Sequence, residues 1–159
     1  MEMTVETSGW QYCSSELDGG YEFAKKFKPI FKLWNKKRGD AALPSWKDFE
    51  FEDFIGWHEF IILTEVNLEP FDLHYRIYSS FASNIYNKNF TGKTMRSLTP
   101  TLDNASDINH YERLQKQQKI GASFGPVKWP EKDHMNISML DLPLSADGRT
   151  VTHFLSCIQ

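Results

Sequence analysis

The chain has 159 residues, which is the length of one domain of ordinary size. Hydrophobic residues make up 40% of it and aromatic residues 14%, enough for a packed core, which argues against a disordered chain. The net charge of -3 argues against a nucleic-acid-binding protein, because such proteins usually carry a basic face. The N-terminal residues lack the apolar core of a secretory signal, and no run approaches the ~18 apolar residues of a membrane span. We therefore expect a cytoplasmic protein without a membrane span.

The N-terminal part divides into a lead-in and a helix. Residues 1–20 are polar and acidic, and we predict a flexible segment there. Residues 21–39 predict an amphipathic N-terminal helix with Gly39 as its C-terminal stop. Pro29 either opens the main helix at its first turn or kinks a longer one. Its apolar stripe consists of Phe27, Ile30, Phe31 and Trp34. The lysines lie mostly on the opposite face, which we interpret as solvated; contact with an acidic membrane or with RNA is the alternative.

Residues 40–159 have the pattern of one domain. Two strands are expected over 59–66 and 71–79, followed by short helices and by a surface helix from Ser106 to Ile120 that Gly121 ends. Three further strands are expected over 122–129, 134–144 and 150–158. Strands joined by short turns pair antiparallel, so the predicted fold class is α+β.

The last two predicted strands meet at Asp147-Gly148, which is a strong β-hairpin signal. A tight loop centred there would pair Leu144 with Val151. Both faces of this hairpin are apolar, so neither can lie in water. We expect small helices to cover one face, and the N-terminal helix, alone or with a second subunit, to cover the other.

Five short motifs, by their order and spacing, resemble a family of short bacterial PAS-like proteins. The motifs are Trp34 in LWNKKRG, Pro44 in LPSW, Arg76 in LHYRI, the step Thr91-Gly92, and LPLSADGRTV over 142–151. The resemblance runs from about Phe27 to Ile158. One departure is Ser79-Ser80, which stands where that family usually has Gly-Thr.

The resemblance implies a PAS-like five-stranded antiparallel sheet in the spatial order 2-1-5-4-3, with short helices on one face. It also implies that the last strand lies inside the sheet, between the first and the fourth. The implied function is a non-enzymatic PAS-type module for sensing, ligand binding or protein interaction. Such a module would signal to a separate partner protein through the packing of the N-terminal helix. That helix would also form a homodimer contact with Phe27, Ile30, Phe31 and Trp34.

A ligand cavity of such a module would lie between the sheet and the short helices. Its candidate lining residues are Tyr75, Arg76, Ser80, Tyr86, His110, Trp129 and His153. For the tyrosines and the tryptophan, core packing is the alternative. Arg76 would pair either with a carboxylate such as Asp141 or with an anionic ligand. His153 would be either a buried histidine with one hydrogen bond or a ligand contact.

Catalytic and cofactor motifs are missing from the sequence. It has no phosphate-binding loop, paired-cysteine zinc pattern, HExxH motif or nucleophile elbow, and its five histidines are scattered, so we expect no metal site and no catalytic residues. The cofactor is unknown: a haem on His110 is disfavoured, and so is a flavin photosensor, because residues 79–100 contain no cysteine. Two other functions stay open. One is a small enzyme with acid–base chemistry, for example His153 with Asp141 or Tyr75, and the other is a ligand-free adaptor domain.

Overall fold

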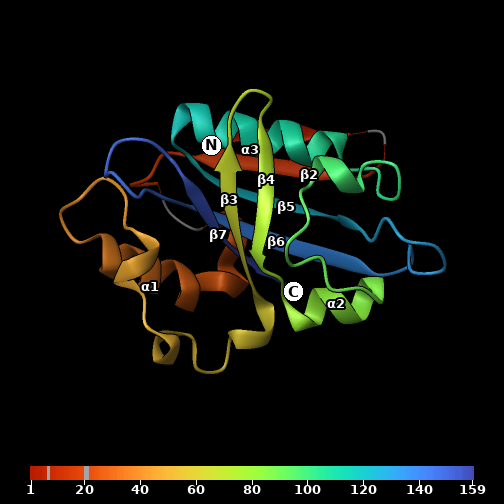
Figure 1. The fold of residues 1–159 in the computed structure, drawn as a ribbon, viewed down its shortest axis with the longest axis horizontal. Helices are drawn as coiled ribbons and strands as arrows, with labels where there is room; N and C mark the ends of the chain where they lie inside the picture. The colour runs from red at the N-terminus through yellow and green to blue at the C-terminus, as the bar shows by residue number, and fades with distance from the viewer. Residues whose placement is uncertain (7, 20–21) are drawn as a thin grey trace.

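The computed structural model describes residues 1–6, 8–19 and 22–159, which form an α+β fold around one open antiparallel sheet (Figure 1). The strands are β1 (Glu2–Val5), β2 (Gln11–Ser15), β3 (Ile61–Asn67), β4 (Asp72–Ile77), β5 (Ile120–Pro126), β6 (Asn136–Leu144) and β7 (His153–Ile158). The α-helices are α1 (Lys28–Arg38), α2 (Ser80–Tyr86) and α3 (Ala105–Gln117). Short 3-10 helices are η1 (Glu22–Phe27), η2 (Trp46–Asp48), η3 (Phe51–Phe54), η4 (His58–Phe60) and η5 (Arg96–Leu98). None of the helices in these ranges is long and apolar enough to cross a membrane.

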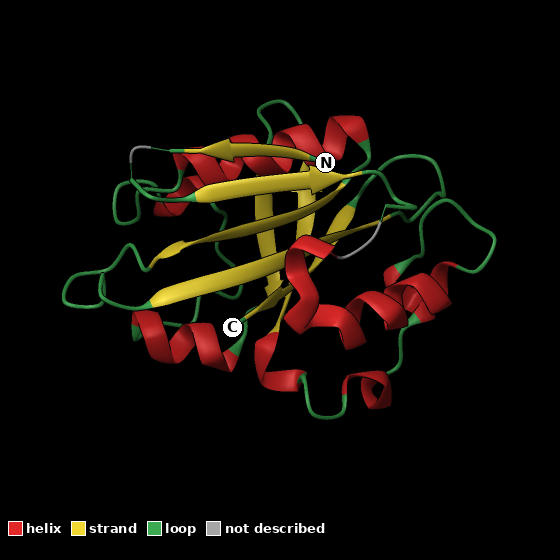
Figure 2. Ribbon diagram, turned by 180° about the vertical axis from the view of Figure 1, so that it is seen from behind, coloured by secondary structure: helices red, strands yellow, loops and turns green. Residues whose placement is uncertain are grey.

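The strands follow one another across the sheet in the order β1-β2-β5-β6-β7-β3-β4. The predicted five-stranded sheet is therefore wrong, because the described residues form a sheet of seven strands. The five strands expected from the sequence lie next to each other within it, as β4-β3-β7-β6-β5. β7 pairs with β3 and with β6, so the last strand lies inside the sheet, as expected. The sheet is strongly twisted, with β3 and β4 crossing the other strands steeply (Figures 1 and 2).

The two additional strands come from the segment predicted to be flexible. Residues 2–5 and 11–15 form a hairpin, and β2 extends the sheet by pairing with β5. Trp10 and Tyr12 are buried, and the Trp10 Nε1–H donates to the Pro126 carbonyl at 2.9 Å. A Cβ at position 125 would overlap the Trp10 ring, so Gly125 lets this ring lie flat on the sheet. The predicted boundary between lead-in and helix, at residues 20 and 21, lies outside the described residues.

The helix predicted over 21–39 is not the first element, because it follows β1 and β2. Within it, α1 begins at Lys28 with Pro29 in its first turn, so of the two alternatives the proline opens the helix. Gly39, with a φ of 54°, follows the last residue of α1 and ends the helix as predicted. Its apolar stripe is buried in one core cluster with Leu140 and Leu142 of the sheet. The Trp34 Nε1–H donates to the Pro143 carbonyl at 2.9 Å, which attaches α1 to β6. This helix therefore covers one face of the sheet.

The opposite face is covered by α2 and α3. The helix expected on the surface is half embedded; its buried residues are Ile108, His110, Tyr111, Leu114 and Gln115. The predicted stop at Gly121 is wrong, because α3 ends at Gln118 in a left-handed conformation and Gly121 lies in β5. A Cβ at position 121 would overlap the Leu114 side chain and lie 2.8 Å from His110 Nε2. The glycine thus allows α3 to approach the sheet closely.

The final hairpin has a wider loop than predicted. Leu144 pairs with His153 instead of Val151, a shift of two residues. The reason is the Asp147 carboxylate, whose Oδ1 accepts from the backbone N–H of Arg149 and of Thr150, both at 2.8 Å, and organises a longer loop. Because side chains alternate with a period of two, the shift leaves the apolar faces as predicted.

We predict that Trp34→Phe lowers the free energy of unfolding by about 2 kcal/mol, since it removes the hydrogen bond to Pro143 and leaves a gap beneath α1. Trp46→Phe is the control, because Trp46 is only half-buried and stacks on aromatic neighbours; it should cost less than about 1 kcal/mol. Urea unfolding measures both variants. Equal losses would contradict the anchoring role of Trp34.

Asp147→Asn gives a prediction about pH. Hydrogen bonds from the backbone N–H groups of Thr150 and Arg149 lower the pKa of Asp147 from 3.8 to about 2. The ionised loop is therefore stabilised above the pKa of the unfolded chain, and this contribution is lost as the pH falls toward 2. The stability difference between wild type and variant should be constant above about pH 5 and should shrink between about pH 4 and 2. Acid unfolding of both proteins is the measurement. A stability difference that stays the same between about pH 4 and 2 would refute the lowered pKa of Asp147.

Candidate functional site

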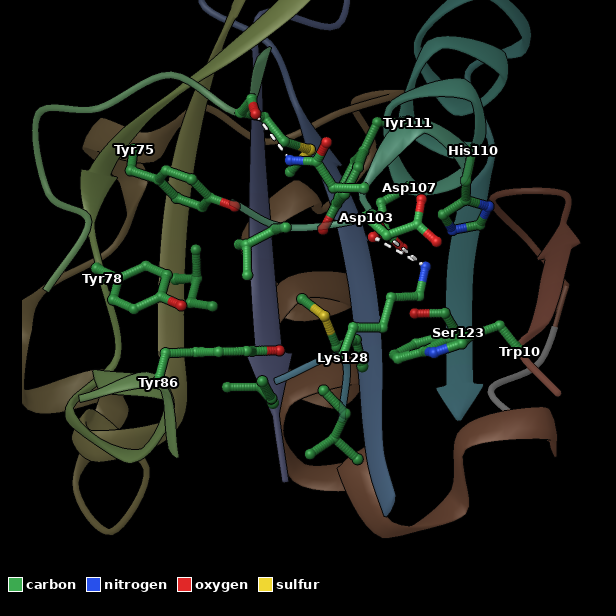
Figure 3. A pocket seen from close by; sticks show the side chains of 17 residues that line it. Trp10, Tyr75, Tyr78, Tyr86, Asp103, Asp107, His110, Tyr111, Ser123 and Lys128 are labelled. Atoms are coloured by element: carbon green, nitrogen blue, oxygen red, sulfur yellow. Dashed lines mark hydrogen bonds and ion pairs between the residues drawn. The ribbon is translucent and has the colours of Figure 1, made fainter. Parts of the chain in front are cut away.

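A cavity of about 80 Å³ lies between the sheet, α2 and α3 (Figure 3). Its apolar floor comes from three strands and consists of Ile62 of β3, Ile137 and Met139 of β6, and Ile158 of β7. One water needs roughly 10–15 Å³ of such volume, so the cavity has room for several water-sized groups. A single-ring molecule is of this order of size.

Three tyrosines form one wall of the cavity. Tyr75 belongs to β4, Tyr78 follows that strand, and Tyr86 ends α2. Edge-to-face contacts fix the rings, with centroids 5.1 Å apart for Tyr75 and Tyr78 and 5.7 Å apart for Tyr86 and Trp129. Figure 3 shows the three hydroxyl groups directed into the cavity, and none has a hydrogen-bond partner among the described residues. Burial raises the pKa of each phenol, that of Tyr86 to about 12, so all three are protonated at neutral pH.

The opposite wall is polar and centres on Asp107 of α3. The Tyr12 hydroxyl donates to Asp107 Oδ1 at 2.7 Å, and Lys128 Nζ lies 3.9 Å from Oδ2. Lys128 also donates to the Asp103 carbonyl at 2.8 Å and lies over the Trp10 ring, 5.2 Å from its centroid. Burial raises the pKa of Asp107, while Lys128 and the Tyr12 hydrogen bond act in the opposite direction. The wall therefore holds an anion and a cation side by side.

Behind this wall, the fully buried Asp141 connects α3 to the middle of the sheet. Its Oδ1 accepts from the Tyr111 hydroxyl at 2.6 Å and from the Ser156 hydroxyl at 2.7 Å. His110 Nε2 lies 3.4 Å from Asp141 Oδ2. A buried carboxylate is tolerated only with such partners. Burial, and then Asp141, raise the pKa of Tyr111 well above its ordinary value. Since His110 also lines the cavity, this cluster joins the cavity wall to β6 and β7.

Of the predicted cavity residues, Tyr75, Tyr86 and His110 line the cavity. Trp129 supports the ring of Tyr86 from outside the lining. Ser80 is exposed in the first turn of α2.

Two other predicted cavity residues, Arg76 and His153, lie elsewhere. Arg76 Nη2 donates to both carboxylate oxygens of Glu65 at 3.1 Å in a half-exposed ion pair, so the suggested pair with Asp141 is wrong. His153 Nε2 lies 3.5 Å from Glu65 Oε2, and burial lowers the pKa of this histidine. Alternation along the paired strands puts His153 and Asp141 on opposite faces of the sheet.

The residues predicted for a homodimer contact, Phe27, Ile30, Phe31 and Trp34, are buried in the core of the single chain. A homodimer stays a prediction, and it would need another surface of α1 or a movement of this helix.

The sequence reasoning missed Asp107 and Lys128 as cavity residues, Tyr12 as the hydrogen-bond donor to Asp107, and Asp141 as the centre of a buried cluster. Asp141 carried a signal, because it is a carboxylate inside the apolar run LDLPL. Asp107 lies at the start of the predicted surface helix, where no pattern marks it as a cavity residue, and Tyr12 lies in the predicted lead-in. Among the described residues there is no group of three or more histidine, cysteine, aspartate or glutamate side chains that could hold a metal ion. Cys13 and Cys157 are both free thiols.

No protein-family model matches the chain, and no curated protein or solved structure matches it either. The chemistry of the cavity is therefore the basis for proposing a function.

We predict that Tyr111→Phe lowers the free energy of unfolding by about 2 kcal/mol, because a buried carboxylate loses a hydrogen-bond donor. Tyr78→Phe also removes a tyrosine hydroxyl, but one without a hydrogen-bond partner among the described residues. It should change the free energy of unfolding by no more than about 0.5 kcal/mol. Urea unfolding of both variants is the measurement. A loss for Tyr78→Phe as large as that for Tyr111→Phe would contradict the proposed hydrogen-bond network.

Proposed function

We propose that this protein is a non-enzymatic PAS-type module that binds a small molecule in the cavity and transmits its occupancy to a separate partner protein. The observation that carries the proposal is the set of three tyrosine hydroxyls directed, without a described partner, into a cavity with an apolar floor (Figure 3). The three tyrosines are half-buried, so their hydroxyls are open to whatever occupies the cavity. An adaptor with a filled core would not need these hydroxyls, whereas a ligand could satisfy them.

The arrangement of the fold supports a PAS-like architecture. Five consecutive strands of the sheet have the order β4-β3-β7-β6-β5, the order that the resemblance implies, although β2 and β1 extend the sheet. The helices α2 and α3 lie on the cavity face of the sheet, and α1 packs on the other face, where Trp34 donates to the Pro143 carbonyl (Figure 2).

A chain of contacts supports a route from the cavity to α1. Tyr111 of α3 is bound to Asp141, and Trp34 of α1 is bound to Pro143, two residues further along β6. A ligand that displaces α3 would therefore act on the strand that holds α1. The exposed side of α1 would then present the change to the partner protein or to a second subunit.

An enzyme is the second candidate, because Asp107, His110 and Lys128 converge on the cavity and burial raises the pKa of Asp107. Asp107 would be its general base. The pair His153 and Asp141 considered from the sequence cannot act together across the sheet.

The first experiment compares the native mass of freshly purified protein with its denatured mass, together with an absorbance spectrum. We expect extra mass that disappears on denaturation. Ser123→Phe should abolish it, because Ser123 lies in the cavity wall and the larger side chain fills the space. The matched control Ser138→Phe, a half-buried site on the other face of the sheet, should retain the extra mass.

Two outcomes decide against the proposal. If the native mass of the wild type equals its denatured mass, and no added small molecule changes its signal when the protein is added, the adaptor is favoured. Conversion of the bound molecule to a product, lost in Asp107→Asn, would establish the enzyme.

A further inference from the structure

The hydrogen-bonding groups of the cavity lie on two facing walls, and this arrangement defines a class of ligand. Tyr75, Tyr78 and Tyr86 each supply an O–H from one wall (Figure 3). On the opposite wall Lys128 has three N–H groups. The Asp103 carbonyl accepts one of them at 2.8 Å, and Asp107 Oδ2 lies nearby at 3.9 Å. A ligand therefore meets donors on both sides.

Asp107 Oδ2 is a carboxylate oxygen of this lining that accepts no hydrogen bond from the described residues, so it is available to a ligand. Its partner atom Oδ1 is occupied by the Tyr12 hydroxyl, whereas the 3.9 Å between Oδ2 and Lys128 is longer than a hydrogen bond. The second carboxylate nearby, Asp141, is directed toward Tyr111 and Ser156 instead. The acceptor thus lies across the cavity from the three tyrosines (Figure 3).

The charges near the cavity disfavour an ionised ligand. Asp107 and Lys128 offset each other, and the exposed Asp103 and the buried Asp141 add negative charge that would repel a carboxylate. A cation would meet the Lys128 ammonium group, which already occupies the face of the Trp10 ring. An uncharged molecule avoids both costs.

From these observations we infer that the ligand is an uncharged single-ring molecule with a carbonyl-type acceptor at one edge and an N–H or O–H donor at the opposite edge. The acceptor edge binds the tyrosine hydroxyls and the donor edge binds Asp107 Oδ2, while the ring lies on the apolar floor of β3, β6 and β7. The ring size follows from the cavity volume of about 80 Å³. The inference rests on the proposed function, because it assumes that this cavity binds the ligand.

The test uses four probes of nearly equal shape in titration calorimetry at pH 7. They are 4-aminoacetophenone with donor and acceptor, 4-ethylaniline with the donor only, acetophenone with the acceptor only, and the anion 4-aminobenzoate. We expect 4-aminoacetophenone to bind at least about fivefold more tightly than each of the other three, as one buried hydrogen bond contributes about this factor.

A variant separates hydrogen bonding from fit. The double variant Tyr75→Phe/Tyr86→Phe removes two donors and keeps the rings. It should weaken 4-aminoacetophenone by at least about fivefold and leave 4-ethylaniline, which cannot use these donors, unchanged. The second probe thereby controls for any change in the folding or shape of the variant.

Three results would overturn the inference: equal affinities for 4-aminoacetophenone and 4-ethylaniline, a preference for 4-aminobenzoate, or no binding of any probe. The native mass comparison decides the proposed function separately. A cavity ligand of a different class, found by its released mass, would leave the proposed function standing and refute this inference alone.

Discussion

The buried carboxylate of Asp141 is the interaction on which the arrangement of the cavity depends. It lies in the centre of the sheet without solvent exposure and is held by hydroxyl groups from α3 and β7. Because an unpaired buried carboxylate is strongly disfavoured, α3 must stay where the Tyr111 hydroxyl can reach it. This fixes the helix close to Gly121, and it thereby fixes the positions of Asp107 and His110 in the cavity wall.

The two faces of the sheet are covered in different ways, and this difference separates stability from ligand binding. On one face, α1 packs large apolar side chains onto the strands and is attached by Trp34. On the other, the steep crossing of β3 and β4 leaves the tyrosines of β4 and α2 facing α3 across a space that the protein does not fill (Figure 3). β6 belongs to both faces, so a change at the cavity can reach α1 through one strand.

Local patterns in the sequence predicted most elements, whereas contacts between distant segments stayed hidden. The alternation of apolar residues predicted the strands from residue 61 onward. The backbone restrictions of Pro29 and the freedom of Gly39 marked the two ends of α1. The N-terminal hairpin was missed because its strands are polar and gain their stability from pairing with β5, more than 100 residues away. The cavity was predicted in part, because Tyr75, Tyr86 and His110 were expected to line it. Its polar wall depends on contacts of Asp107 with Tyr12 and Lys128, which are far apart in the sequence and follow no local pattern.

The central claim, that this cavity binds an uncharged single-ring molecule, is tested most directly by methyl NMR of the methionines. Met95 and Met139 line the cavity, while Met3 and Met135 are exposed elsewhere and serve as internal controls. On titration with 4-aminoacetophenone, the methyl signals of Met95 and Met139 should shift and saturate together, and those of Met3 and Met135 should stay in place. Shifts confined to Met3 and Met135, or no shift at all, would contradict the claim.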